Sequence, residues 1–126
     1  MSHFTEIATE IRDPVALMEA CDELGLRLEK DAAARGYGGM TRRGEFVIKL
    51  KGPYDVALNR NNGGAYALEA DHWQGHVEQE LGSGFGRLLQ LYGVHKARIE
   101  AQRRGYAVRR RSMADGSIKL TIGGVR

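Results

Sequence analysis

Residues 83–106, SGFGRLLQLYGVHKARIEAQRRGY, form the longest stretch of sustained helical periodicity in the chain. Side chains that are mostly apolar recur around this stretch at spacings of three and four, which places them on one stripe of a helix. The stripe consists of Leu81, Phe85, Leu88, Tyr92, His95 and Ile99. Ser83 is the predicted N-cap, and Gly105 is the predicted left-handed stop. We therefore expect a long helix whose stripe packs on a sheet made by the remaining chain.

Length and composition predict one α+β domain over residues 1–126, which is enough chain for a core without metal or disulfide support. The 42% apolar and 28% charged residues are typical of a globular protein. The single cysteine, Cys21, excludes an internal disulfide and fits a reducing compartment. No apolar run approaches the ~20 residues of a membrane helix, and the first residues lack a signal-peptide core. We expect a cytoplasmic protein that does not contact a membrane.

The net charge of +3 is unevenly distributed. Residues 95–126 hold nine basic and two acidic residues, a balance of +7, whereas the remainder holds ten basic and fourteen acidic residues, a balance of −4. This asymmetry predicts one of two things. Either a basic face attracts an anionic partner, or a solvated helix face and an exposed strand both carry arginine.

The N-terminal part reads as a strand followed by a helix. Residues 4–11 are the predicted strand, Asp13 is the predicted N-cap, and Pro14 takes the first helical position before a stop at Gly25. The expected buried stripe of this helix is Val15, Met18 and Cys21, flanked by Leu17 and Leu24. Because Cys21 lies on that stripe with nothing nearby to lower its pKa, it is predicted to be a core thiol and not a nucleophile.

A glycine-rich segment follows a short second strand predicted at residues 26–29. The segment 31–44, DAAARGYGGMTRRG, contains three arginines and Tyr37 among its glycines. Two interpretations are open: a flexible surface loop, or a loop whose backbone N–H groups cradle an anion. It lacks the Gly-Lys-Ser/Thr ending of a P-loop.

Alternating apolar residues predict the next strands. One covers residues 46–50, and two more cover 54–58 and 66–70 on either side of the turn Asn61–Gly64. Two period-two runs around an Asn/Gly turn are a strong hairpin signal. Residues 71–76 are expected to leave the sheet.

A second hairpin is predicted at the C-terminal end, from residues 106–108 through a turn at Asp115-Gly116 to residues 118–122. Arg109–Arg111 lie on its first arm. Consecutive strand residues point to opposite faces and a buried unpaired charge is costly, so this arm is expected at an edge or outside the sheet. Charged edges also prevent strand-to-strand aggregation.

The favoured interpretation of the sequence includes no metal, cofactor or catalytic residue. His72 and His76 have ligand-like spacing, but Gly75 disfavours a helix there and no third ligand is near in sequence. Trp73 is interpreted as a loop anchor. Residues 81–87, LGSGFGR, resemble a phosphate loop only weakly, and more simply separate a short helical turn from the long helix.

Six segments occur in an order that resembles a known family. They are MSHFTEIATEIRD at 1–13, ARGYGG at 34–39, YDVALN at 54–59, YALEADHW at 66–73, LYGVHKARIEAQRRGYAV at 91–108 and ADGSIKL at 114–120. The chain thereby resembles the conserved reading frame thirty-five family of plastids and cyanobacteria, which has relatives in other bacteria. The resemblance implies a compact α+β domain without an assigned active site. The family's strand after the helix tends to be acidic, so the arginines at 109–111 depart from its pattern.

These observations predict an α+β fold, with a mostly antiparallel sheet covered by one long and one shorter helix in the order β-α-β-β-β-β-α-β-β. The favoured function is a non-enzymatic adaptor that acts through protein contacts or self-association. The first alternative is nucleic-acid or anion binding through basic side chains. These side chains are Arg35, Arg42, Arg43, Lys96, Arg103, Arg104, Arg109, Arg110 and Arg111.

The second alternative is a small-ligand site formed by Tyr37, Tyr92 and His95. Histidine side chains titrate near neutral pH, which makes His95 the candidate general base. The competing interpretation is a core histidine that is hydrogen-bonded to a neighbour.

Overall fold

The computed structural model describes residues 4–125, so Met1, Ser2, His3 and Arg126, which entered the sequence interpretation, lie outside the described residues. The strands are β1 Phe4–Ala8, β2 Arg27–Arg35, β3 Thr41–Lys49, β4 Val56–Arg60, β5 Tyr66–Asp71, β6 Tyr106–Ser112 and β7 Ile118–Val125. The α-helices are α1 Pro14–Leu24, α2 His76–Leu81 and α3 Gly86–Arg103. Short 3-10 turns occur at η1 Tyr37–Gly39, η2 Trp73–Gly75 and η3 Ser83–Phe85.

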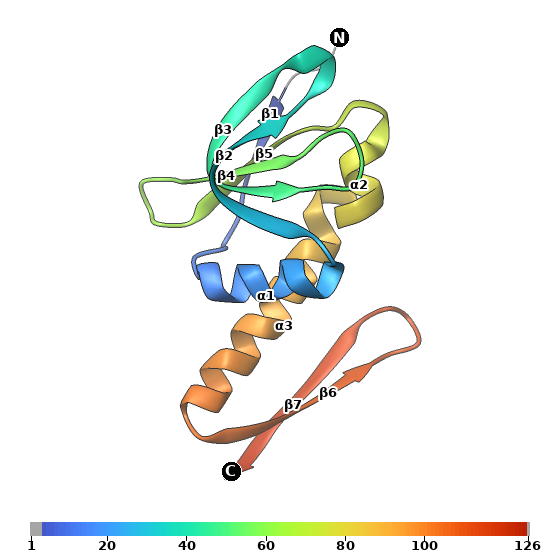
Figure 1. Ribbon diagram of the computed structural model, residues 1–126. Helices are drawn as coiled ribbons and strands as arrows, with labels where there is room; N and C mark the ends of the chain where they lie inside the picture. Colours follow the sequence, from blue (N-terminus) through green and yellow to red (C-terminus); the bar gives the residue numbers. More distant parts are fainter. Residues whose placement is uncertain (1–3, 126) are drawn as a thin grey trace.

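An antiparallel sheet with the strand order β1-β5-β4-β3-β2 forms the body of the molecule. The helices α1 and α3 lie against this body, and the hairpin β6–β7 forms a second sheet at the far end of α3 (Figure 1). The predicted α+β class, the antiparallel pairing and the order of elements are confirmed. The short helix α2 is an addition to the predicted order.

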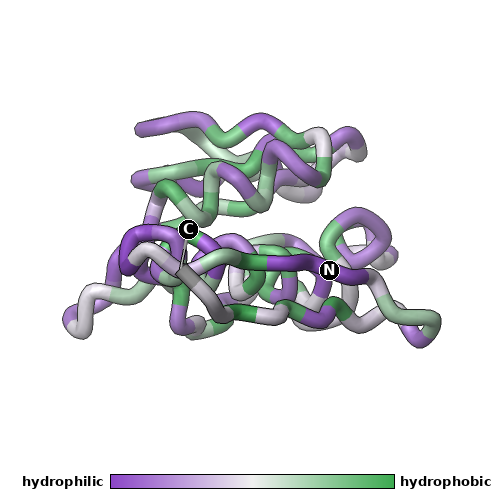
Figure 2. Tube along the Cα trace, turned by 90° about the horizontal axis from the view of Figure 1, so that it is seen from below, coloured by the Kyte–Doolittle hydropathy of each residue, from purple (hydrophilic) through white to green (hydrophobic). Residues whose placement is uncertain are grey.

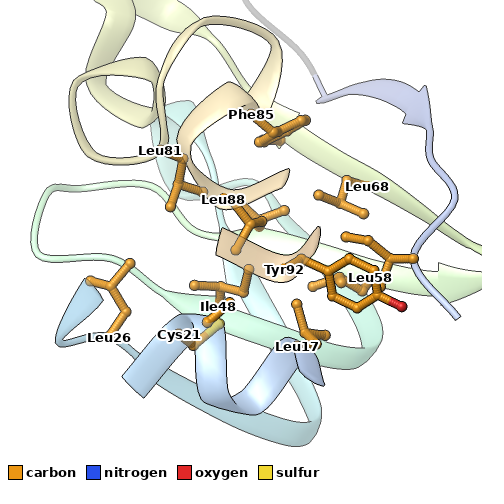
Figure 3. Close-up of a cluster of buried hydrophobic side chains, with 14 of the residues drawn as sticks. Leu17, Cys21, Leu26, Ile48, Leu58, Leu68, Leu81, Phe85, Leu88 and Tyr92 are labelled. Atoms are coloured by element: carbon orange, nitrogen blue, oxygen red, sulfur yellow. The ribbon is translucent and has the colours of Figure 1, made fainter. Parts of the chain in front are cut away.

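The main core lies between the helices and one face of the five-stranded sheet (Figure 3). Leu81, Phe85, Leu88 and Tyr92 of the predicted stripe are buried there, against sheet residues that include Ile48, Leu58 and Leu68. Beyond Tyr92, α3 leaves the sheet and contacts α1 through His95. The long helix therefore covers the sheet with its first half and packs on α1 with its second.

The buried side of α1 includes Cys21 and Leu17 as predicted, but not Val15 and Met18. Val15 and Met18 are 52% and 47% exposed, and the buried residues are Ala16, Leu17, Ala20 and Cys21. The prediction favoured the larger side chains, whereas the helix approaches its neighbours with its two alanines. Asp13 and Gly25 cap the helix as predicted, and burial raises the pKa of the Cys21 thiol to about 12, which keeps it protonated.

The segment 31–44 is a long hairpin and not a flexible loop. The strands β2 and β3 run through most of it, and left-handed backbone occurs at Asp31 within β2 and at the turn around Gly38 and Gly39. The hairpin curls across the second face of the sheet, so that a Cβ on Gly36 would lie 2.8 Å from the ring of Phe4 on β1, at the opposite edge. A small second core fills the space beneath it. Its buried members are Ala34, Val47 and Ala57.

The long helix begins differently from the prediction. Ser83 is not its N-cap: the helix starts at Gly86 after the turn η3, and the capping position belongs to Phe85, whose φ of 63° is left-handed. In this conformation the ring of Phe85 is fully buried in the core. The predicted break between a short helical turn and the long helix is present, and Gly105 has the expected left-handed φ of 85°.

Figure 2 shows polar residues interrupting the apolar ones along the chain. No helix within residues 4–125 is long and apolar enough to cross a membrane.

Candidate interaction surfaces

An exposed aromatic pair lies where the β2–β3 turn meets η2. The rings of Tyr37 and Trp73 are in edge-to-face contact with their centroids 5.7 Å apart, although the side chains are 46% and 39% exposed. Met40, which ends the same turn, is 48% exposed. We call Tyr37, Met40 and Trp73 the aromatic patch. It presents large apolar side chains to solvent on two segments that are distant in sequence.

One carboxylate, that of Asp71 at the end of β5, holds both halves of the aromatic patch. The backbone N–H of Tyr37 donates to Asp71 Oδ2, and that of Trp73 donates to Asp71 Oδ1, both at 3.0 Å. Asp71 is almost completely buried. Because the carboxylate fixes both backbones, the two rings are positioned before any partner arrives. Sequence reasoning missed this role; the only local signal was the tendency of Asp to accept a bond from the N–H two residues later.

Arg35, the first arginine of the glycine-rich segment, is half exposed and pairs with a buried carboxylate. Arg35 Nε and Nη2 donate to Asp55 Oδ2 and Oδ1 at 2.8 Å each, and Asp55 is fully buried. Burial alone would raise the pKa of Asp55, but the hydrogen bonds from Arg35 and from the Leu50 N–H outweigh it and lower that pKa. Arg35 therefore has a structural role, because the guanidinium N–H groups that could bind an anion side by side already donate to Asp55.

The neighbouring arginines also have partners within the fold. Arg42 Nε lies 3.3 Å from Glu69 Oε2 on β5, and its guanidinium lies over the Phe4 ring at 5.6 Å. Arg43 Nη2 donates to the carbonyl of Asp31 at 3.0 Å. Together with Arg35, these side chains fasten the curled hairpin β2–β3 and do not converge on one anion site.

A charged cluster connects α1, α3 and β6. His95 Nε2 lies 2.7 Å from Glu23 Oε1 and its Nδ1 lies 3.4 Å from Glu19 Oε2, while Arg98 of α3 also pairs with Glu19. Arg110 donates to both oxygens of Glu23, at 2.8 and 2.6 Å. The hydrogen bond from Arg110, with a further contribution from His95, lowers the pKa of Glu23 to about 2. The cluster thus attaches the hairpin β6–β7 to α1.

The three residues of the predicted small-ligand site have separate surroundings. Tyr37 belongs to the aromatic patch, and His95 belongs to the charged cluster. The Tyr92 hydroxyl accepts hydrogen bonds from the N–H groups of Arg12 and Asp13, both at 3.0 Å, and so anchors the start of α1. The structure does not bring the three side chains together around one ligand.

The two histidines with metal-like spacing also face different neighbours. The ring of His72 packs on Phe85 with a centroid distance of 5.6 Å, and its Nδ1 lies 3.5 Å from Glu78 Oε1. His76 stacks edge-on against Tyr54 at 5.4 Å. Within residues 4–125, no three His, Cys, Asp or Glu side chains gather in a way that could hold a metal ion.

Some of the remaining basic residues form ion pairs within the fold, and others do not. On α3, Lys96 contacts Asp13 and Glu100, and Arg103 contacts Glu100. Within residues 104–125, the one basic side chain that follows α3 and three basic side chains of the hairpin have no ion-pair partner. These are Arg104, Arg109, Arg111 and Lys119.

The hairpin β6–β7 has one basic and one apolar face. Arg111 pairs with Lys119 and Arg109 with Thr121, so these side chains share a face because cross-strand partners project to the same side. We call Arg109, Arg111 and Lys119 the basic row. Like charges directly opposite each other destabilise a hairpin, and an anionic partner would relieve that repulsion.

The opposite face of the hairpin is largely apolar, and only part of it is covered. Its residues are Val108, Arg110, Ser112, Ile118, Leu120 and Ile122. Ile118 packs against the main core, but Ile122 is exposed. A shallow hollow of about 320 Å³ lies between this face and the end of α3, where Ala97, Tyr106 and Ile122 are among its lining residues.

The fold and its surfaces define the chain as a small α+β protein with a curled antiparallel sheet and a C-terminal hairpin that follows the second half of α3, which we call the helical stem. The chain belongs to the family described as "Protein of unknown function (DUF1257)", whose model matches residues 20–121. It is 29% identical over 126 residues to the "Uncharacterized protein ycf35" of Guillardia theta, which covers 97% of this chain and 96% of that protein. The resemblance predicted from the sequence segments is confirmed. No solved structure gives a significant match.

Proposed function

We propose that the chain is a small cytoplasmic interaction domain without enzymatic activity, and that it binds a protein partner through the aromatic patch. The observation that carries this proposal is the exposed pair Tyr37 and Trp73, fixed from beneath by the buried carboxylate of Asp71. Aromatic residues and methionine are enriched at the energetic centres of protein interfaces. Anchors that are already ordered lose little conformational entropy on binding, which favours affinity.

An adaptor needs a second surface that stays accessible when the first is occupied. The β2–β3 turn, which carries half of the aromatic patch, and the hairpin β6–β7 lie at opposite ends of the molecule, with the sheet and the helices between them (Figure 1). A partner on the aromatic patch therefore leaves the hairpin free. This separation supports a bridging role more than a site for one small ligand.

Replacing Trp73 with alanine is expected to weaken capture of the partner by more than tenfold, because interface anchors of this type contribute about 2 kcal/mol or more. Met18→Ala is the matched control, since Met18 is a similarly exposed apolar side chain on α1. Both tagged variants would be used with the native chain in quantitative pull-downs from the source organism, with and without nuclease. Proteins that all three chains retain equally would contradict the proposal.

The basic row supports nucleic-acid binding as a second candidate function. Arg109, Arg111 and Lys119 share one face with no carboxylate partner among the described residues, and the exposed ring of Tyr106 begins the same strand. The turn that carries Tyr37 is at the other end of the molecule, so the Tyr37 ring and the basic row cannot both contact one short nucleic-acid strand (Figure 1). This separation makes protein binding through the aromatic patch the better-supported function.

Single-stranded RNA binding, measured by fluorescence polarisation, is expected to weaken steeply with added salt if the basic row neutralises phosphates. Arg111→Gln is expected to lower both the affinity and the salt slope. Arg87→Gln, which removes an exposed cation at the start of α3, is expected to change neither. Absence of RNA binding at low salt would reject this candidate.

A further inference from the structure

The hairpin β6–β7 is a two-stranded sheet whose outer edges are both unpaired within residues 4–125. Two-stranded hairpins are marginally stable in water, and unpaired edges offer N–H and C=O groups to another strand. Here one face is only partly covered, with Ile122 exposed. A third strand would both pair an edge and extend the apolar face.

The charges distinguish the two edges. If β6 paired with β6 of another copy around Arg110, then Arg109 would lie opposite Arg111, and Arg110 opposite itself. Every central pair would join two cations, which is unfavourable. The edge of β7 carries one cation, Lys119, between Ile118 and Leu120.

The sequence of β7 is self-complementary. Antiparallel pairing of residues 118–122 with a second copy, centred on Leu120, places Ile118 opposite Ile122, Lys119 opposite Thr121 and Leu120 opposite Leu120. No cation then faces another across the new pair. A two-fold symmetric interface requires this property, because each patch must fit its own copy. The paired segment also ends before Gly124, where a left-handed φ of 71° interrupts the regular strand.

We propose that two copies of the chain associate through their β7 strands, in the register centred on Leu120, to form one four-stranded antiparallel sheet. Cross-strand partners share a face, so Ile118, Leu120 and Ile122 of both copies form one apolar face toward the helical stems. The two basic rows join on the other face. This inference goes beyond the proposed function because it uses a different surface from the aromatic patch, so either can fail alone.

Two charge variants test the register. Both add ion pairs within the hairpin of one chain, so neither is expected to destabilise the monomer. Thr121→Glu places a carboxylate opposite Arg109 within the hairpin and opposite Lys119 of the second copy, so dimerisation should strengthen by about 2- to 30-fold, since two new ion pairs form per dimer. Adding Lys119→Glu places a second carboxylate opposite Arg111 but sets two carboxylates against each other at each new pair. The double variant should dissociate more readily than the native chain. Sedimentation equilibrium over a concentration series measures all three, and circular dichroism confirms their fold.

Cysteine cross-linking provides an independent measurement. Leu120→Cys places two thiols directly opposite each other at the two-fold axis, within reach of a disulfide, whereas Ile118→Cys separates the equivalent thiols by about 13 Å along the strands. Mild oxidation should cross-link the first variant and spare the second, and the buried Cys21 takes no part. A native chain that stays monomeric at high concentration, or a dimer that responds equally to both charge variants, would overturn the proposal. Trp73-dependent partner capture would survive either result.

Discussion

Replacing Asp55 with alanine is expected to lower the free energy of unfolding by about 2–4 kcal/mol, because the N–H groups of Arg35 and Leu50 and the half-exposed Arg35 guanidinium lose a buried, charged acceptor. The carboxylate is fully buried and accepts hydrogen bonds from the Arg35 side chain, from the Arg35 N–H and from the Leu50 N–H. Lys49 Nζ lies a further 3.5 Å away. Without the carboxylate, the N–H groups of Arg35 and Leu50 would lose their acceptor where the end of β2 contacts the β3–β4 connection.

Urea unfolding at neutral pH measures this loss, and Glu29→Ala is the control. Glu29 pairs with Arg27 at 3.3 Å on an exposed part of β2, where an ion pair contributes about 0–1 kcal/mol. If Asp55→Ala proved no more destabilising than Glu29→Ala, the buried Asp55 carboxylate would not hold β2 and the β3–β4 connection together.

The contribution of Asp55 to the free energy of unfolding should also depend on pH, in a direction that follows from its pKa. The folded-state pKa of Asp55 is lowered, so its stabilising contribution is fully present above the unfolded pKa of about 3.9 and is lost as the pH falls through the folded value. The native chain should therefore lose stability more steeply than Asp55→Ala as the pH falls below about 4. Parallel curves for the two chains would contradict the assigned pKa direction.

The elements that sequence predicted well are those whose periodicity arises from large side chains. The stripe from Leu81 to Tyr92 and the alternation on β4 and β5 both show their buried faces directly. The continuation of β2 and β3 through residues 31–44 could not be predicted, because this part of the hairpin packs through small residues. Ala34 is buried where two layers meet, and a Cβ on Gly44 would lie 2.4 Å from the Phe46 carbonyl. Small residues chosen for close approach leave no alternating pattern to detect.

The interaction surfaces were only partly predictable for a related reason. A sequence counts cations but does not reveal their partners, and Arg110 is neutralised by Glu23, 87 residues away. Tyr37 and Trp73 were each recognised separately, yet their pairing depends on Asp71, which is 34 residues from Tyr37. What sequence did provide was the alternation in the last hairpin, from which the separate faces of Arg109 and Arg110 follow.

Replacing Phe85 with alanine is expected to lower the free energy of unfolding by about 3–5 kcal/mol, because a fully buried aromatic ring leaves a cavity. The alanine would also keep the left-handed backbone at this position, which is unfavourable by about 1–2 kcal/mol for any residue with a Cβ, without the ring burial that offsets it. The start of α3 should therefore become the least protected part of that helix in hydrogen exchange.

Ser83→Ala tests the other explanation for the start of α3, namely that Ser83 caps the helix. A true N-cap serine would contribute about 0.5–2 kcal/mol, but Ser83 is exposed and makes no capping hydrogen bond, so its removal should change the free energy of unfolding by less than about 0.5 kcal/mol. Denaturant unfolding of both variants makes the comparison. A large loss from Ser83→Ala with a small one from Phe85→Ala would mean that capping fixes the start of α3. The reverse result would mean that burial of one aromatic ring determines where the long helix begins, and with it how the stem of the hairpin leaves the sheet.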